Sequence, residues 1–350
     1  MKIFLVDLKN DIVGHYHIMK CLNSLPQTEE INTCEKKYKF KESPIRFFKQ
    51  RYKIVKHTMR SINEQYNGMN AVVHYLTADK FYFLFWLFPG KLKGKKIVAT
   101  IHRVPRNKIL QRIMLSFSNR VDAIIVLSNY LREELQQFGI SNVYTVEHPS
   151  FYDYTGIRSK EELRNANNIS NDKMVISFLG GMRYEKGIDI FLNAFKYLDE
   201  SYKEKILVNI AGEEKEIKSN FILQQIKELN IIAKCNFKRL SDEEFMENVV
   251  ISDYIVTPYR KTFNGMSGLL AEALSQGIGC IVPNTGILGH YGRLFDSHLT
   301  FKSENPRSLA NSILYCLKQH PTISQECRLI FQKETFITNM QRIYYSLLKT

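Results

Sequence analysis

The 350-residue sequence lacks several features that would assign it to common classes of protein. Its six cysteines, at positions 21, 34, 235, 280, 316 and 327, form no Cys-x-x-Cys pair and no Cys/His cluster with zinc spacing. The longest strongly apolar run, residues 81–88, has eight residues, which is too short to cross a bilayer. The first residues, MKIFLVDLKND, lack the apolar length and cleavage site of a secretory signal. These absences favour a cytoplasmic protein in a reducing compartment.

Acidic residues are scarce in the first half of the chain only. Residues 1–160 hold 26 Lys and Arg against 13 Asp and Glu, a net charge of +13. Residues 161–350 hold 23 against 22, a net charge of +1. The length fits two domains, and the charge asymmetry predicts that the first of them faces an anionic partner.

A junction between a predicted strand and a predicted helix lies within residues 255–286. An apolar run ends at Ile255 and Val256, and the helix begins at Leu269 after four small or flexible residues, Gly265, Met266, Ser267 and Gly268. Such a junction leaves backbone N–H groups free at the positive end of the helix dipole, which is a common phosphate site. Glu272 falls one turn into the helix, within reach of a sugar hydroxyl. An ordinary capped βαβ unit explains this segment equally well.

A second junction of the same kind lies within residues 175–195. A predicted strand over residues 175–179 runs into Gly180 and Gly181, and Arg183 and Lys186 lie in the loop before the next helix. Cations at the carboxyl end of a parallel strand are well placed to neutralise a pyrophosphate. The alternative is that both are solvated loop charges.

The whole chain resembles the GT-B-fold retaining glycosyltransferases of family 4 type, which include many transferases of bacterial polysaccharide and glycolipid synthesis. The resemblance is carried, in the family's order, by ATIHRV (99–104), AIIVLSNYLREEL (123–135), the loop with Lys186-Gly187, AGE (211–213), SGLLAEAL (267–274) and IYYSLLK (343–349). It implies an α/β fold of two Rossmann-like domains facing each other across a cleft, with a C-terminal helix that crosses back. We expect an acceptor-binding domain at 1–160 with the returning helix 336–350, and a nucleotide-sugar-binding domain at 161–335.

The resemblance also implies roles for individual residues. It assigns catalysis to His102, Arg183 and Lys186. It assigns donor binding to a larger set: Gly14, Gly180, Gly181, Arg239, Leu240, Asn264, Gly265, Met266, Ser267, Gly268, Leu269 and Glu272. His15, Arg103 and Arg106 are candidates for binding the acceptor, although Gly14 and His15 also fit a plain strand-to-helix turn.

No metal or cofactor is expected, because the chain has no Asp-x-Asp motif to hold a divalent ion on the donor. Lys186, Arg183 and the helix N-terminus near Ser267 would stabilise the leaving phosphate instead. The nucleotide sugar, carrying UDP or GDP, is a substrate.

Two positions depart from the family's pattern. The family carries two glutamates eight positions apart; Glu272 matches the second, and Asn264 stands in place of the first. The family also has an arginine where this chain has Gly181, and Arg183 is the candidate substitute. Both departures favour an unusual donor sugar or an inactive homologue.

Residues 35–60 are the most basic stretch of the chain. Ten cations alternate with aromatic residues against only Glu35 and Glu42. This composition suits an anionic bilayer surface. It also suits a solvated helix whose aromatic residues pack on the domain, or a nucleic-acid surface, although no nucleic-acid-binding motif occurs and no such partner is expected.

The predicted function is therefore metal-independent, retaining transfer of a sugar from a nucleotide-diphosphate donor to a saccharide or lipid-linked saccharide acceptor. The enzyme would be hexosyltransferase-like, act in surface polysaccharide or glycoconjugate synthesis, and lie peripherally on the inner face of the plasma membrane. The alternatives are a non-hydrolysing sugar-nucleotide epimerase, against which Asn264 argues, and an inactive partner subunit that keeps the fold.

Overall fold

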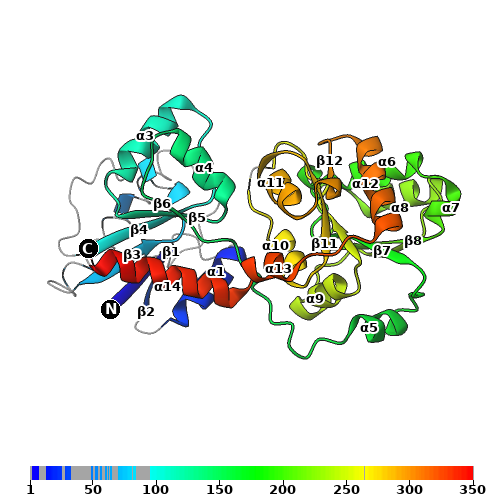
Figure 1. The fold of residues 1–350 in the computed structure, drawn as a ribbon, viewed down its shortest axis with the longest axis horizontal. Helices are drawn as coiled ribbons and strands as arrows, with labels where there is room; N and C mark the ends of the chain where they lie inside the picture. Colours follow the sequence, from blue (N-terminus) through cyan, green and yellow to red (C-terminus); the bar gives the residue numbers. More distant parts are fainter. Residues whose placement is uncertain are drawn as a thin grey trace. The chain divides into compact units, whose positions relative to one another are not determined.

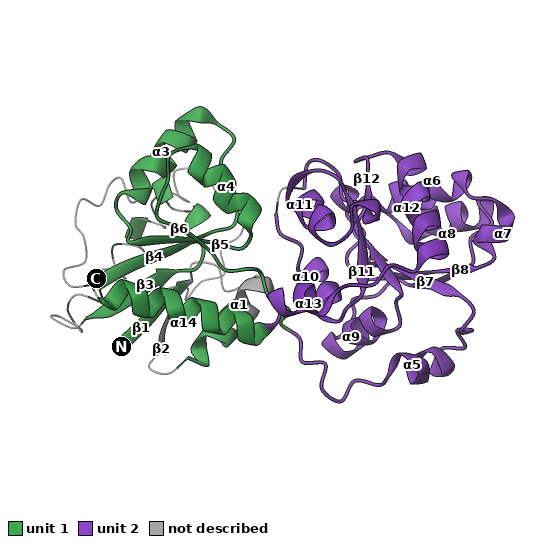
Figure 2. Cartoon of the chain, viewed as in Figure 1, with its two compact units in different colours: residues 1–151, 333–350 green, residues 152–332 purple. Residues whose placement is uncertain are grey.

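The structure, a computed structural model, describes residues 2–7, 13–25, 28–32, 70–80, 82–83, 95–263 and 265–349, together with residues 49, 52, 53, 56, 60, 62 and 64. The chain forms two compact units, residues 1–151 with 333–350 and residues 152–332 (Figure 2). The units divide at 151/152 and 332/333, whereas the sequence placed the boundaries at 160/161 and 335/336.

Unit 1 is built on a parallel sheet of six strands in the order β2-β1-β3-β4-β5-β6 (Figure 1). Its strands are β1 Lys2–Asp7, β2 Thr28–Asn32, β3 Ala71–Tyr75, β4 Lys95–Ile101, β5 Ala123–Val126 and β6 Val143–Thr145. Every residue of β3 and β5 is buried, as expected where helices cover both faces of a parallel sheet. The order in which strands are added to the sheet reverses at β1, which lies between β2 and β3.

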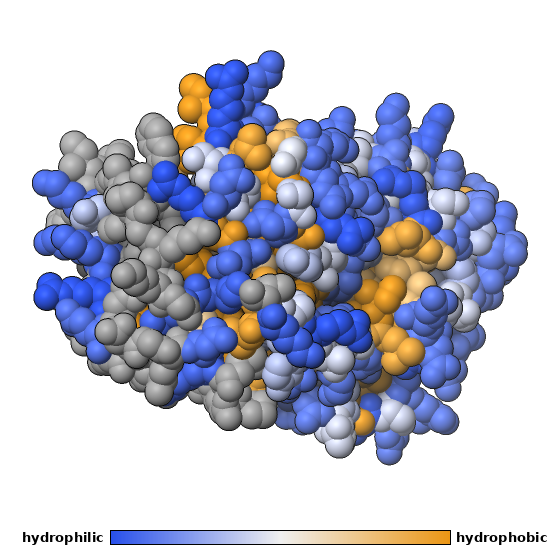
Figure 3. All heavy atoms as spheres, turned by 60° about the vertical axis from the view of Figure 1, so that its left-hand side comes forward, coloured by the Kyte–Doolittle hydropathy of each residue, from blue (hydrophilic) through white to orange (hydrophobic). Residues whose placement is uncertain are grey.

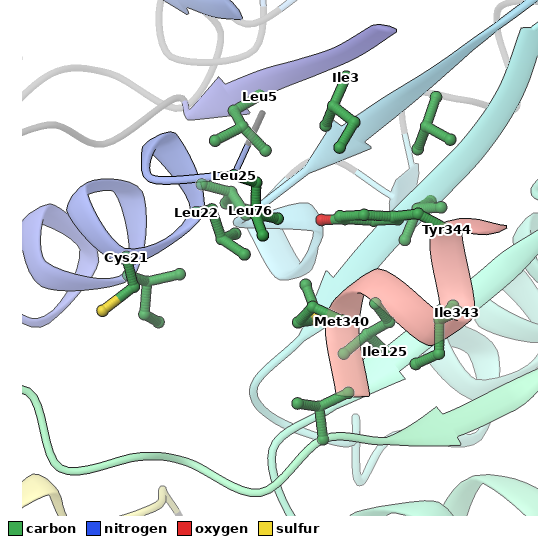
Figure 4. Close-up of a cluster of buried hydrophobic side chains, with 14 of the residues drawn as sticks. Ile3, Leu5, Cys21, Leu22, Leu25, Leu76, Ile125, Met340, Ile343 and Tyr344 are labelled. Carbon is green, nitrogen blue, oxygen red and sulfur yellow. The ribbon is translucent and has the colours of Figure 1, made fainter. Parts of the chain in front are cut away.

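The helices of unit 1 whose bounds the structure describes are α1 Val13–Asn23, α3 Lys108–Ser118, α4 Asn129–Gln137 and α14 Lys333–Lys349. The C-terminal helix α14 packs with α1 on one face, and its Met340, Ile343 and Tyr344 share a buried cluster with Leu22 and Leu76 (Figure 4). The return of the last helix to the first domain is confirmed.

A buried hydrogen-bond network ties α14 to the sheet. His74 in β3 shares a hydrogen bond of 2.6 Å through Nδ1 with the Tyr344 hydroxyl. Its Nε2 shares one of 2.7 Å with the Thr100 hydroxyl in β4. Burial, with a smaller contribution from His102, lowers the pKa of His74 to about 3, so the imidazole is neutral at physiological pH.

Unit 2 is also built on a parallel sheet of six strands, in the order β12-β11-β10-β7-β8-β9 (Figure 1). Its strands are β7 Met174–Leu179, β8 Ile206–Ala211, β9 Ala233–Asn236, β10 Tyr254–Val256, β11 Gly279–Pro283 and β12 Thr300–Phe301. Strand order reverses between β7 and β10. In open α/β sheets this switch point is where ligands bind, outside the carboxyl ends of the strands.

The helices of unit 2 are α5 Lys160–Ala166, α6 Ile188–Ala194, α7 Glu200–Lys203, α8 Ser219–Glu228, α9 Asp242–Val250, α10 Gly268–Ser275, α11 Gly286–Phe295, α12 Pro306–Gln319 and α13 Gln325–Ile330. Helix α6 packs with α8 and α12, whereas α10 packs with α13. The helices that follow β7 and β10 therefore diverge from the switch point, and their N-termini border it.

The sequence predicted part of this set of elements. A capping box of Ser241 and Glu244 starts α9, and Ser128 caps α4. Strands β2 and β12 and helices α3 and α11 were not predicted. A capping box of Ser159 and Glu162 starts helix α5, which runs across the domain boundary that the sequence placed at 160/161.

Two further observations concern membrane contact. No helix that the structure describes combines the length and apolarity needed to cross a bilayer. Most of the basic stretch 35–60 lies outside the described residues, but its described positions are helical, and Lys49, Lys53, Lys56 and Arg60 are exposed. Their spacing places these four cations on one helix face.

Candidate active site

The loops after β7 and β10 meet at the switch point of unit 2. The Arg260 backbone N–H donates to the Glu185 carbonyl oxygen over 2.9 Å, joining one loop to the other. Gly187, at a φ of 68°, starts α6, and a Cβ there would lie 2.1 Å from the Pro258 carbonyl oxygen. Only glycine therefore lets the two loops approach this closely.

Lys186 points its ammonium group back over the end of β7. A Cβ on Gly180, whose φ is 110°, would lie 2.7 Å from Lys186 Nζ, so the ammonium occupies the space that a side chain would fill. The same Nζ lies 5.3 Å from the centroid of the Tyr259 ring, in cation–π geometry. Among the described residues no carboxylate pairs with Lys186, so its charge remains available to an anionic ligand.

The N-terminus of α10 presents free backbone amides. Ser267 is its N-cap residue, and its side chain makes no capping hydrogen bond. Going along the helix, Leu270 and Ala271 are the first residues whose N–H groups donate to a protein acceptor, the Ser267 carbonyl oxygen. Within the described part of the chain, the N–H groups of Gly265, Met266, Gly268 and Leu269 donate to no backbone carbonyl, as an anion-binding helix N-terminus requires.

Tyr259 connects the cation to these amides. Its ring lies beneath Lys186 Nζ, and its hydroxyl lies 3.4 Å from the Ser267 hydroxyl, within hydrogen-bond distance. The side chain is 3% exposed and packs edge-on against Phe263, with ring centroids 4.6 Å apart. The structure thus places Lys186 over the ring of Tyr259 and the N-cap residue of α10 next to the hydroxyl of the same side chain.

Arg260 holds the two loops together. Its Nη2 lies 2.7 Å from Asp189 Oδ2 in the first turn of α6, and its guanidinium stacks on the Tyr184 ring at 3.9 Å. The residue is 8% exposed, so this ion pair is largely shielded from water. Because Tyr184 belongs to the same loop as Lys186, Arg260 holds the loop that carries the lysine.

Glu272 is buried in α10, with 2% of its surface exposed. The Tyr154 hydroxyl donates to its Oε2 over 3.3 Å. Burial, and then the charge of Glu272, raises the pKa of Tyr154, and burial with Asp242 and Glu272 raises the pKa of Tyr152 to about 12. Both tyrosines are therefore neutral, and Tyr154 is the one that donates to the Glu272 carboxylate, which lies one turn from the free amides.

The other predicted donor-binding residues lie at the same edge of the sheet or outside the described residues. Gly181 follows Gly180 directly, and Arg183 Nη1 is paired with Glu185 Oε1 at 2.8 Å with a half-exposed side chain. Arg239 and Leu240 lie in the turn after the edge strand β9. Asn264 lies outside the described residues.

His102 lies in unit 1, at the carboxyl end of β4. Its Nδ1 shares a hydrogen bond of 2.9 Å with Asp79 Oδ2, and Asp79 Oδ1 accepts from the backbone N–H groups of His102 and Arg103. Burial would raise the pKa of Asp79, but the charge and hydrogen bonds of His102 lower it overall. An ionised Asp79 fixes the ring and places its proton on Nδ1.

The predicted acceptor-side residues of unit 1 are split between two places. Arg103 and Arg106 are exposed in the segment that follows His102. Gly14 and His15 lie inside α1, which begins at Val13, rather than in a loop before it. The sequence suggested a turn between strand and helix at Gly14 and His15, and the structure shows that this expectation is wrong.

Sequence reasoning missed three residues that build these sites: Tyr259, Arg260 and Asp79. Each is a polar or aromatic residue just beyond a predicted parallel strand, and that position is the signal that could have found them. Among the residues that the structure describes, no three His, Cys, Asp or Glu side chains gather closely enough to hold a metal ion.

Two family models match the chain. Residues 159–329 match the glycosyl transferases group 1, and residues 35–149 match glycosyltransferase family 4. Together the two matches cover most of both units. No sequence among the curated proteins matches the chain.

Solved structures share the whole fold. The Anabaena protein HepE in complex with UDP is similar with a TM-score of 0.71 and 14% identity over 99% of this chain and 100% of its own. A glycosyltransferase from Rickettsia africae has a TM-score of 0.66 and 16% identity, covering 99% and 98%. Sucrose-phosphate synthase from Thermosynechococcus elongatus has a TM-score of 0.68 and 14% identity, covering 92% and 83%. With both domains matched and the fold shared end to end, the chain belongs to the GT-B glycosyltransferases of family 4 type.

Proposed function

We propose that this glycosyltransferase moves a sugar from a nucleoside-diphosphate donor with retention of configuration and without a metal ion. The observation that carries the proposal is the unpaired Lys186 ammonium. It lies over the ring of Tyr259, whose hydroxyl is within hydrogen-bond distance of Ser267 at the N-terminus of α10, where the free amides are. A diphosphate bound there meets a fixed cation on one side and a helix N-terminus on the other. The similar Anabaena HepE binds UDP and glucose, which supports a uridine nucleotide as the first donor to test.

Charge develops on the leaving diphosphate during the reaction. The bond between the anomeric carbon and the diphosphate oxygen breaks, and the oxygen keeps the electron pair. The acceptor hydroxyl attacks from the same face, and its proton passes to the leaving phosphate. Lys186 and the α10 amides are already oriented toward that charge, so little reorganisation is needed. Glu272 would accept a hydrogen bond from a ribose hydroxyl, beside the one that it accepts from the neutral Tyr154 hydroxyl.

The acceptor is proposed to be an anionic or lipid-linked saccharide in polysaccharide or glycoconjugate synthesis, used at the inner face of the plasma membrane. Support comes from unit 1, where His102 is fixed by Asp79 and followed by exposed Arg103 and Arg106. The exposed cations Lys49, Lys53, Lys56 and Arg60 add a basic helix face in the same unit.

The test is calorimetry with UDP, GDP and ADP, followed by transfer assays with the sugar nucleotides of the base that binds. We expect one base to bind and Lys186→Ala to lower turnover by about a hundredfold or more, on the order of 3 kcal/mol, as loss of a charge-stabilising group does. The matched control is Lys196→Ala, an exposed lysine on the short turn after α6.

Three outcomes would count against the proposal. A loss of less than about threefold in Lys186→Ala would remove this lysine from the mechanism. Conversion of the sugar nucleotide without any acceptor would indicate an epimerase. An absence of nucleotide binding would indicate a subunit that keeps the fold without the activity.

A further inference from the structure

The segment that follows His102 contains no acidic residue over nineteen positions, 103–121. It contains five cations, Arg103, Arg106, Lys108, Arg112 and Arg120, and the first four are exposed. One of these cations, Arg106, acts on a carboxylate of α4: burial raises the pKa of Glu134, and a hydrogen bond from Tyr130 and the charge of Arg106 lower it in part. The other three exposed cations have no carboxylate partner within the described residues.

Two large apolar side chains project from the same place. Ile109 is 68% exposed, the largest value for a large hydrophobic residue in the described part of the chain, and Leu110 beside it is 39% exposed. Figure 3 shows apolar and hydrophilic residues side by side at the top of unit 1, where α3 lies. Exposed apolar surface rimmed by polar residues marks an interaction site more often than an accident of packing.

This exposure is built into the helix and is not a frayed end. Asn107 caps α3, and its side chain accepts from the backbone N–H groups of Ile109 and Leu110. Gln111 Nε2 donates to the Pro105 carbonyl oxygen over 2.9 Å, which fixes the turn before the helix. The core-facing side of α3 is a different set, Met114, Phe117 and Ser118. The apolar pair therefore has no role in the described core.

The surface adjoins the predicted acceptor side of unit 1. The backbone N–H groups of His102 and Arg103 both donate to the Asp79 carboxylate. Ile109 follows His102 by seven residues along the chain. Whatever the end of α3 contacts is thus brought close to His102.

We propose that the α3 docking surface, defined as Ile109 and Leu110 with Arg103, Arg106, Lys108 and Arg112, contacts an anionic lipid bilayer. Interfacial helices use this arrangement. Their apolar side chains enter the headgroup region, and the flanking cations remain at its surface. An anionic bilayer presents a continuous field of negative charge to this acid-free basic rim, and this match favours a bilayer over a protein partner. The inference deepens the proposed function, since it explains how a lipid-linked acceptor would reach His102.

The test is flotation of the full chain with vesicles of phosphatidylcholine alone and of phosphatidylcholine with phosphatidylglycerol. We expect the wild type to float only with the anionic vesicles. The double variant Ile109→Ser, Leu110→Ser should bind those vesicles about tenfold or more weakly, because two side chains no longer leave water. The double variant Lys108→Gln, Arg112→Gln should also lose binding and should show a flatter dependence on salt.

Matched controls exist in unit 2. Leu294 in α11 is 58% exposed and follows a cation, Arg293, so Leu294→Ser removes similar apolar surface without touching α3. Lys227→Gln removes one exposed charge from α8. Thermal melting of each variant checks that the fold is retained, which is expected because every changed side chain is exposed.

The outcomes separate this inference from the proposed function. Equal flotation of the wild type and the Ile109, Leu110 variant would overturn the bilayer contact, as would equal loss in Leu294→Ser or equal binding to neutral vesicles. Self-association through this face with no vesicle binding would also overturn it. UDP binding by the same variants should equal that of the wild type. If the wild type itself bound no nucleotide, that result would contradict the proposed donor site and not the bilayer contact.

Discussion

At the scale of single residues, Gly181 is the clearest departure from the family's pattern, and the structure leaves room for a side chain there. A Cβ on Gly181 would lie 3.5 Å from Lys215 Cγ and 3.7 Å from the Glu213 carbonyl oxygen, which are ordinary contacts. Lys215 is paired with Glu213 at 2.6 Å, so its charge is already partnered. The position therefore accepts a longer residue without strain.

We expect Gly181→Arg to fold normally and to bind a nucleoside diphosphate more tightly, by roughly three- to tenfold, because a second cation joins Lys186 at the diphosphate. Calorimetry with UDP measures the effect. Gly181→Gln, of similar length but neutral, is the control. Equal affinities for the two variants would show that charge at this position does not reach the ligand.

The residues that the sequence could predict are those whose chemistry shows in a local pattern. Lys186 and the small residues before α10 stand at strand-to-helix junctions, and the structure brings them to one switch point. Tyr259 and Arg260 could not be assigned in this way. Their roles depend on contacts with Ser267 and Asp189, and the second of these is far away in the chain.

At the scale of elements, the loops after β7 and β10 behave as one clamp because Arg260 spans them. Its side chain contacts Asp189 and Tyr184, and its backbone contacts Glu185. The common effect of these contacts is to hold the loop that carries Lys186.

Arg260→Gln is expected to lower the free energy of unfolding by about 1–3 kcal/mol, because Asp189 loses a partner in a largely buried pair. It should also weaken UDP binding, since the Lys186 loop is no longer held. Urea unfolding and calorimetry measure the two effects. Lys261→Gln, at the exposed neighbouring position, is the control, and a variant that lost stability with unchanged UDP affinity would separate the clamp from the site.

The elements that the sequence missed have a shared physical cause. Strands such as β7 and β8 are long apolar runs, and their burial on both faces makes them visible in sequence. Strand β2, TEEIN, and strand β12, with two residues, are edge strands of their sheets and carry little of this signal. Their pairing with β1 and β11 is decided by tertiary contacts, which local composition does not report.

At the scale of the whole molecule, the charge states of two histidines in the described part of unit 1, the buried His74 and the partly buried His148, couple folding to pH. Burial lowers the pKa of His74 to about 3, and burial lowers that of His148 to about 4 despite a hydrogen bond to the Pro149 carbonyl oxygen. In the unfolded chain both imidazoles take up a proton near pH 6.5, approximately their ordinary pKa. Between that value and about pH 4, the unfolded state therefore binds more protons than the folded one.

Stability should accordingly be greatest above about pH 6.5 and fall as the pH is lowered, by up to about 1.4 kcal/mol per pH unit for each histidine. The His74→Gln variant should be less stable than the wild type at about pH 7.5, because Tyr344 and Thr100 lose a shared partner, yet its stability should depend less on pH. Urea unfolding at about pH 7.5 and about pH 5 measures both quantities. His320→Asn, at an exposed left-handed position that asparagine tolerates, should keep the wild-type pH dependence. An identical pH dependence in His74→Gln and the wild type would mean that His74 takes up its proton at the same pH in the folded and unfolded chains, and the network beneath α14 would then have no part in acid sensitivity.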